Sequence, residues 1–139
     1  MKKSILVSLA FGASLLTGLG TVSTTANAST WHKGIPSALS GTYTFHRHHS
    51  VRGNDWVEFH KSSWTMIPNG TKASVTKNAK WSHINKSYRI KGTIYAYGRK
   101  FNSDTVIYKS GNKLKIADYS QYKHHGFKGN HDIWYKGRS

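Results

Sequence analysis

The chain lacks cysteine entirely and contains few acidic residues. Without cysteine, disulfide bonds, thiolate metal sites, cysteine nucleophiles and a lipid-modified cysteine anchor are all excluded. Only 5 of the 139 residues are Asp or Glu, so paired carboxylates for acid–base chemistry have few candidates. Asp55 and Glu58 are three residues apart, and on a strand their side chains would point to opposite faces. No Gly-x-Ser-x-Gly nucleophile motif is present either, so we expect a protein that is not an enzyme.

Long apolar runs are also missing, apart from one near the start of the chain. Two lysines precede the mostly apolar stretch Ile5–Leu19, and Ala26-Asn27-Ala28 matches the small-x-small pattern of a signal-peptidase site. We therefore expect residues 1–28 to be a cleaved secretory signal peptide and residues 29–139 to form one domain. An uncleaved membrane anchor is the alternative, but the apolar stretch is short for a span of about 20 residues. The protein is then expected to be secreted, and either released or associated non-covalently with the cell wall.

Alternation of apolar and polar residues, rather than helical spacing, dominates the rest of the chain. In Tyr88–Ala96, Ile90 and Ile94 fall on one face, and Arg89 and Lys91 fall on the other. A period of two with one apolar face is typical of a half-buried antiparallel strand. This segment is therefore predicted to be a strand with its cationic face outward.

A hairpin is the clearest local prediction. Val106–Lys109 and Lys113–Ile116 are β-prone runs, and Ser110-Gly111-Asn112 links them with turn residues.

Other segments are predicted more coarsely, as follows: strands at Thr42–Arg47, Asp55–Ile67 (with a bulge at Ser62-Ser63), Thr71–Ile84 (with Ala73, Val75, Ala79 and Trp81 on one face) and Ile133–Tyr135, and a loop at Ser120–Asn130.

About seven or eight strands without helices predict an all-β fold, either a sandwich or a closed barrel. We favour a small single-domain antiparallel β-barrel because closure removes exposed strand edges. Aliphatic residues are few, but 5 Trp and 8 Tyr supply large apolar area for a core. The residues expected to face the barrel interior are Tyr43, Ile90, Ile94, Ile107, Leu114 and Ile116.

The segment Trp31–Tyr43 reads W-x-K-G-x-P-x-x-L-x-G-x-Y. This pattern resembles the opening of small secreted β-barrel proteins of lactic acid bacteria, and also the G-x-W entry to the first strand of lipocalin-like barrels. The resemblance implies a lipocalin-like barrel in which Gly41 permits a close approach. It also implies that Tyr43 takes the place of the tryptophan that closes the barrel floor. Ala117-Asp118-Tyr119 is similar to the T-D-Y turn of lipocalins, with alanine in place of threonine.

Positive charge is the strongest compositional signal. The chain has 21 Lys and Arg against 5 Asp and Glu, a net charge of +16, and loss of Lys2 and Lys3 would leave +14. Such a surplus concentrates anionic partners by long-range attraction. We expect a diffuse basic coat that binds anionic cell-wall polymers or an anionic membrane surface, with no physiological nucleic acid partner. The representative contact residues are Lys91, Lys113, Lys115, Lys123 and Lys128.

Three other interpretations remain open. The basic surface can be a solvated face without a specific partner. The barrel interior can carry a small apolar ligand, or the protein can be a cationic antimicrobial or bacteriocin-like protein that acts on membranes. In each case we expect a monomer.

Histidine is frequent, with 9 residues, and raises the question of a metal site. His46 and His48 would point the same way on a strand and could share Zn²⁺ or Cu²⁺ with a third ligand such as His60 or His131. The sequence does not fix that third ligand, and surface histidine is the commoner explanation. We therefore expect no metal and no cofactor.

Overall fold

The computed structural model describes residues 30–46 and 53–138, and the predicted signal peptide (1–28) lies outside the described residues. Two short helices occur in these ranges, the 3₁₀ helix η2 (Ser37–Leu39) and the α-helix α1 (Tyr119–His125). The strands are β2 (His32–Lys33), β3 (Gly41–Phe45), β4 (Asp55–Phe59), β5 (Trp64–Ile67), β6 (Ser74–Ile84), β7 (Ser87–Ala96), β8 (Arg99–Ser110), β9 (Lys113–Asp118) and β10 (Trp134–Lys136).

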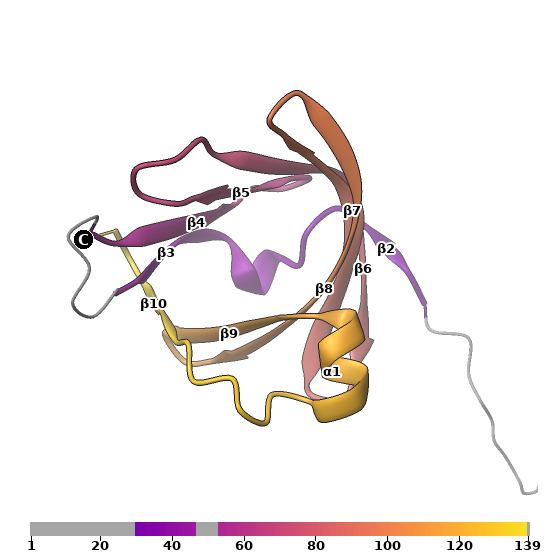
Figure 1. The fold of residues 1–139 in the computed structure, drawn as a ribbon. Helices are drawn as coiled ribbons and strands as arrows, with labels where there is room; N and C mark the ends of the chain where they lie inside the picture. The colour runs from indigo at the N-terminus through magenta and orange to yellow at the C-terminus, as the bar shows by residue number, and fades with distance from the viewer. Residues whose placement is uncertain (1–29, 47–52, 139) are drawn as a thin grey trace, which may run out of the picture.

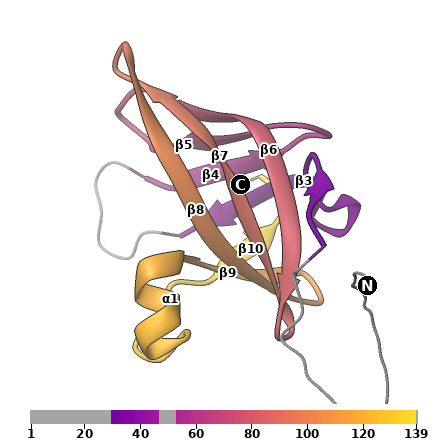
Figure 2. The same cartoon turned by 90° about the vertical axis from the view of Figure 1, so that its right-hand side faces the viewer.

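Eight strands close into an antiparallel barrel (Figures 1 and 2). From β3 to β10 each strand pairs with the next strand along the chain, and β10 pairs back with β3 to complete the circle. The additional strand β2 pairs with β6. This arrangement confirms the predicted all-β, antiparallel barrel of seven or eight strands. Helix α1 has 7 residues, and no helix within the described part of the chain has the length and hydropathy to cross a membrane.

The alternation predicted for Tyr88–Ala96 is confirmed in β7. Ile90 is fully buried, whereas Arg89 and Lys91 are half-buried. Lys91 is the register partner of Asp104 in β8, and residues directly opposite in a ladder share one face of the sheet. The outer face of β7 therefore carries charge, and its inner face contributes to the core.

The predicted hairpin is also confirmed, as β8 followed by β9. The pairing begins at Ser110 and Lys113, which leaves Gly111 and Asn112 in the turn. Gly111 has a φ of 59°, a left-handed conformation that glycine adopts without steric cost. The hairpin is longer than predicted, since its pairing extends to Thr105 and Asp118. Strand β8 itself begins at Arg99 and also pairs with β7 along most of its length.

The prediction of one bulged strand over Asp55–Ile67 is wrong, because this segment forms the two strands β4 and β5. The chain reverses between them, and the amide of His60 donates to the carbonyl of Ser63 at 2.9 Å. The reversal places Phe59 opposite Trp64, and their rings stack with centroids 5.4 Å apart. The hairpin directs Val57, Phe59 and Trp64 into the core, where each is at most 6% exposed.

The face predicted for Thr71–Ile84 is also wrong in part. The register of β6 against β7 shifts between Lys77 and Lys80, and Asn78 within the shift has a φ of 54°. Such a bulge moves the inward positions by one residue. Thr76 before the shift and Ala79 after it are buried. Val75, predicted to lie on the same face as Ala79, instead shares a face with its partner Tyr95, and Tyr95 is exposed.

The expected loop at Ser120–Asn130 contains helix α1, which corrects the prediction of a fold without helices. Asp118 precedes the helix in an extended conformation, and Gly126 ends it with a φ of 59°. The ring of Phe127 packs 5.3 Å from that of Tyr122 in the helix and 6.1 Å from that of Tyr108 in β8. These ring contacts attach the helix to the outside of the barrel (Figure 2).

Aromatic and branched side chains fill most of the barrel interior. The core includes Leu39 of η2, which is fully buried and belongs to the same hydrophobic cluster as Tyr43 and Val57. The ring of Tyr43 meets that of Phe59 edge-on, with centroids 5.9 Å apart. Of the residues expected inside, Tyr43, Ile90, Ile107 and Leu114 are at most 1% exposed, and Ile94 and Ile116 are half-buried.

Gly41, two residues before Tyr43, lies close to the end of the Lys136 side chain. A Cβ at Gly41, whose φ is 118°, would lie 2.7 Å from Nζ of Lys136. The same ammonium group lies 4.9 Å from the ring centroid of Tyr43. Burial raises the pKa of Tyr43, and its hydroxyl has no hydrogen-bond partner among the described residues. Tyr43 is therefore a core residue whose polar atom is not satisfied.

Candidate functional site

A row of lysines crosses three adjacent strands on the outside of the barrel. Lys33 in β2 is the register partner of Lys80 in β6, and Lys80 is the partner of Lys91 in β7. Neighbouring strands lie about 4.8 Å apart, so these side chains start from closely spaced backbone positions. Like charges directly opposite each other destabilise a sheet. A bound anion would relieve the repulsion within this lysine row.

Trp31 lies beside the lysine row. Its ring centroid is 5.1 Å from Nζ of Lys91 and 5.6 Å from Nζ of Lys80. Cζ of Arg89 is 5.8 Å from the same centroid. A tryptophan ring attracts cations within about 6 Å of its centroid, but it does not neutralise them. Trp31 therefore holds the cations close to β6 and β7 while leaving their charge available.

The carboxylate nearest to the row is already engaged. Arg89 donates from Nε to Oδ1 of Asp104 at 2.9 Å and from Nη2 to Oδ2 at 2.7 Å. This hydrogen bonding raises the pKa of Arg89. The guanidinium also lies 3.4 Å from the ring centroid of Tyr119. Asp104 is thus paired with Arg89. No described carboxylate lies within 4.0 Å of an ammonium group of the lysine row.

Two surface depressions meet at Asn78, the residue within the register shift of β6. Their volumes are about 760 Å³ and about 390 Å³, and Asn78 lines both. Together we call them the Asn78 groove, defined by five lysines. The charged residues that line the groove are Lys33, Lys61, Lys77, Lys80, Lys91 and Asp104. The two depressions thus place ammonium groups on both sides of Asn78, where a polymer with repeated anionic groups would meet them in succession.

The five lysines predicted as contacts do not gather in one place. Lys91 belongs to the groove, and sequence reasoning missed Lys33 and Lys80, which join it there. The other four are distributed as follows: Lys113 in β9 is 5.7 Å from the ring of Tyr135, Lys115 donates to the carbonyl of Asn130 at 3.0 Å, Lys123 in α1 is 5.9 Å from the ring of Tyr119, and Lys128 is exposed beyond α1.

The predicted histidine metal set is not brought together. His46 follows β3 at the end where Phe45 pairs with Asp55, whereas His60 follows β4 at the opposite end, where Gly41 pairs with Phe59. At about 3.3 Å per residue, the backbone positions of these two histidines lie on the order of 20 Å apart. His48 lies outside the described residues. No group of three potential metal ligands occurs among the residues that the structure describes.

Exposed aromatic residues gather near the turn between β7 and β8. Tyr97 is 67% exposed and Phe101 is 48% exposed. Tyr95 is the register partner of Lys100, and Nζ of Lys77 lies 5.5 Å from its ring. This hairpin extends beyond the rest of the barrel (Figure 2). It gives the cationic side of the molecule an aromatic tip.

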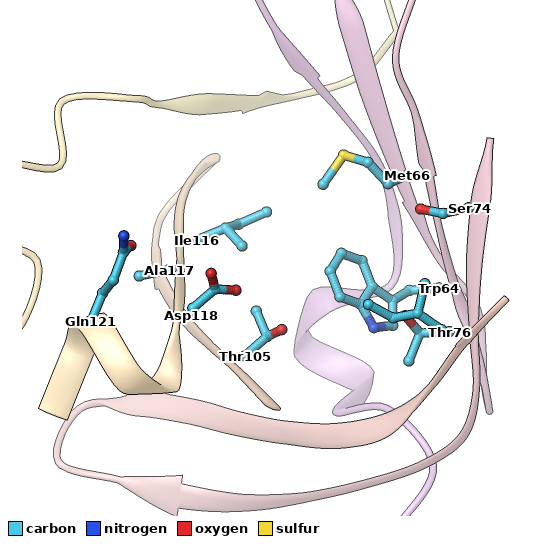
Figure 3. Close-up of a pocket in the computed structure, with 10 residues that line it drawn as sticks. Trp64, Met66, Ser74, Thr76, Thr105, Ile116, Ala117, Asp118 and Gln121 are labelled. Atoms are coloured by element: carbon cyan, nitrogen blue, oxygen red, sulfur yellow. The ribbon is translucent and has the colours of Figure 1, made fainter. Parts of the chain in front are cut away.

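A cavity of about 290 Å³, open to solvent on one side, lies between β5, β6, β7, β8 and β9 and is also lined by Gln121 of α1. Trp64 and Thr76 stand on one side of it, with Ile116 and Asp118 on the other (Figure 3). Its apolar lining consists of Trp64, Met66, Ile94, Ile116 and Ala117. The prediction placed Ile94 and Ile116 in the interior, but it assigned Asp118 no role in a ligand site.

Comparison with known proteins does not assign the chain to a family. No family model, curated protein or solved structure matches it. The Asn78 groove and the cavity are therefore interpreted from their own geometry and charge.

Proposed function

We propose that the protein is a secreted, non-enzymatic binding protein that attaches to anionic cell-envelope polymers through the Asn78 groove. The observation that carries the proposal is the lysine row, in which Lys33, Lys80 and Lys91 face one another across β2, β6 and β7. Repulsion of this kind weakens a sheet, and sites that lower stability are where function is commonly found. A polymer with regularly spaced phosphates or carboxylates would turn the repulsion into attraction.

The shape of the surface supports an extended anion rather than a single small one. The groove continues on both sides of Asn78, from Lys61 and Lys77 to Lys80 and Lys91. Attraction between exposed charges is screened within a Debye length of about 8 Å at physiological ionic strength. Binding should therefore depend on several simultaneous contacts and should weaken as salt is added.

The test compares two triple variants of equal net charge. Lys33→Gln, Lys80→Gln and Lys91→Gln together remove the lysine row, and Lys72→Gln, Lys86→Gln and Lys128→Gln together remove three exposed lysines elsewhere. Adsorption to purified cell walls that contain teichoic acids is measured as a function of protein and salt concentration. Each lysine near an anionic surface contributes about 1 kcal/mol, so the row variant should bind on the order of 100-fold more weakly.

The control variant should lose much less affinity, because its lysines lie outside the groove. Equal losses in the two variants would show that binding depends only on net charge, and would refute the groove. Adsorption by the native protein that does not respond to salt would refute electrostatic attachment altogether.

A second function, the carriage of a small ligand, is favoured by the cavity. Eight-stranded barrels are just wide enough to be filled by their own side chains. Here a volume of about 290 Å³ is left open beside Trp64 and Ile116. Ligand sites typically begin near about 300 Å³, so the cavity suits a small molecule rather than a long lipid.

A further inference from the structure

The charge of the cavity is opposite to that of the rest of the molecule. Asp118 is the charged residue among those that line it, although the whole chain has a net charge of +16. Asp118 is the register partner of Thr105 at the end of β9. Since opposed residues share a face, its side chain lies on the cavity side of the barrel wall, as Figure 3 shows, and Asp118 is exposed there, where the cavity opens to solvent. An anionic ligand would meet this carboxylate.

The carboxylate of Asp118 is not committed to another cation or to the helix that follows it. No described lysine, arginine or histidine makes an ion pair with it. Asp118 precedes α1, yet it makes no side-chain capping hydrogen bond. An acid with so few structural duties, placed at a cavity, is available to accept hydrogen bonds from a ligand.

The indole of Trp64 lines the same cavity. Trp64 is 6% exposed, and its Nε1–H has no hydrogen-bond partner among the described residues. Because this nitrogen is itself closed off from solvent, Trp64 contributes an apolar indole wall to the cavity. The cavity thus combines an apolar wall with one carboxylate at its opening, and an apolar lining with a few polar groups is typical of a ligand site.

We infer that the cavity binds a small primary amine that carries one ring or a short apolar chain, with its ammonium group on Asp118. This inference rests on the second proposed function, small-ligand carriage. An apolar cavity of about 150 Å³ is known to hold benzene, so about 290 Å³ accommodates one ring with a short chain. An ammonium group donates charge-assisted hydrogen bonds to a carboxylate, whereas a carboxylic acid ligand would be repelled.

The test uses three probes that share a ring and a chain but differ in charge: 2-phenylethylamine, 2-phenylethanol and 3-phenylpropionate. Binding to the full chain is followed by NMR, through the indole Nε1–H resonance of Trp64. The amine should bind at least tenfold more tightly than the alcohol, and the acid should bind most weakly. Binding of the amine should not weaken as salt is added, because screening also reduces its long-range repulsion from the cationic protein.

The matched variants are Asp118→Asn and Asp132→Asn, which change net charge equally. Asp132 is exposed and lines a different depression beyond α1. Asparagine is also favoured before a helix, so Asp118→Asn should fold. It should lower amine affinity to that of the alcohol, and Asp132→Asn should retain the native affinity.

Two results would overturn the inference in different ways. If the alcohol or the acid binds as tightly as the amine, the preference for amines is wrong, but small-ligand carriage stands. If none of the three probes shifts the Trp64 resonance, both are wrong. Attachment to anionic polymers is untouched by either result, because the lysine row lies on the opposite face of the strands.

Discussion

On the outside of β6 and β7, Lys80 and Lys91 face each other across the sheet, and on the inside of the same strands Thr76 and Ile94 line the cavity. The outer surface has an excess of cations, and the inner one has a single carboxylate as its charged group. Because successive side chains of a strand point to opposite faces, β6 and β7 present lysines outward and uncharged side chains to the cavity, whose one carboxylate comes from Asp118 of β9. Net charge alone would have suggested one kind of ligand.

The two regions also share an energetic feature. The lysine row contains unrelieved repulsion, and the cavity leaves the packing of the interior incomplete. Elsewhere the barrel is filled, as at Ile107 and Leu114, which are at most 1% exposed. At both candidate sites the native residues therefore stabilise the fold less than they would without the repulsion or the open volume. Substitutions on either side of the barrel wall should change the free energy of unfolding accordingly.

The largest expected effect separates the filled part of the interior from the hollow part. Ile107→Ala should lower the free energy of unfolding by about 3 kcal/mol, because it opens a new cavity in a closed environment. Ile94→Ala should cost only about 1 kcal/mol, because Ile94 already borders open volume. Urea denaturation of both variants measures the difference. Equal losses would mean that the interior is uniformly packed in solution.

A smaller effect is expected at Tyr43, where a polar atom is buried without a cavity beside it. Tyr43→Phe should raise the free energy of unfolding by about 1 kcal/mol, since it removes an unsatisfied hydroxyl. Burial raises the pKa of Tyr43. The folded state therefore favours the neutral hydroxyl over the phenolate. Relative to alkaline pH, this preference adds stability that is fully present below the unfolded-state pKa of about 10 and is lost as pH rises through the folded-state value.

Denaturation of the native protein and of Tyr43→Phe between neutral pH and about pH 11 checks this prediction. The variant should lose less stability in alkali than the native protein. A variant that is less stable than the native protein at neutral pH would show that the hydroxyl has a partner in solution.

The smallest effect concerns the outer surface alone. Lys80→Gln should raise the free energy of unfolding by about 0.5 kcal/mol at low salt, because it relieves repulsion within the lysine row. The gain should disappear near 1 M salt, where the Debye length is about 3 Å. Lys86→Gln, in the turn between β6 and β7, is the control and should change stability little. A loss of stability in Lys80→Gln at low salt would contradict unrelieved repulsion.

Local sequence patterns predicted the parts of the fold that depend on neighbours in the chain. The alternation in β7 and the Gly111 turn were sufficient, because each is encoded within a few residues. The turn between β4 and β5 was missed because its residues, 60–63, include no glycine or proline. Helix α1 was missed because none of its residues is buried, so no apolar periodicity marks it.

The candidate sites depend on contacts that local patterns do not contain. Alternation placed Lys91 on an outer face, but its partners Lys33 and Lys80 follow from strand register. That register includes the shift at Asn78, which a residue in a left-handed conformation creates and which the sequence does not reveal. Asp118 was noted only as part of a turn, because its place beside the cavity depends on the pairing of β8 with β9.

The central claim is that anionic polymers are bound at the Asn78 groove. Backbone-amide NMR of the full chain, titrated with a short soluble poly(glycerol phosphate), tests it most directly. The account predicts that the largest shifts fall at Lys33, Lys80 and Lys91 and at the indole of Trp31, and that added salt reverses them. Shifts spread evenly over all exposed lysines, or confined to residues of the cavity, would contradict it.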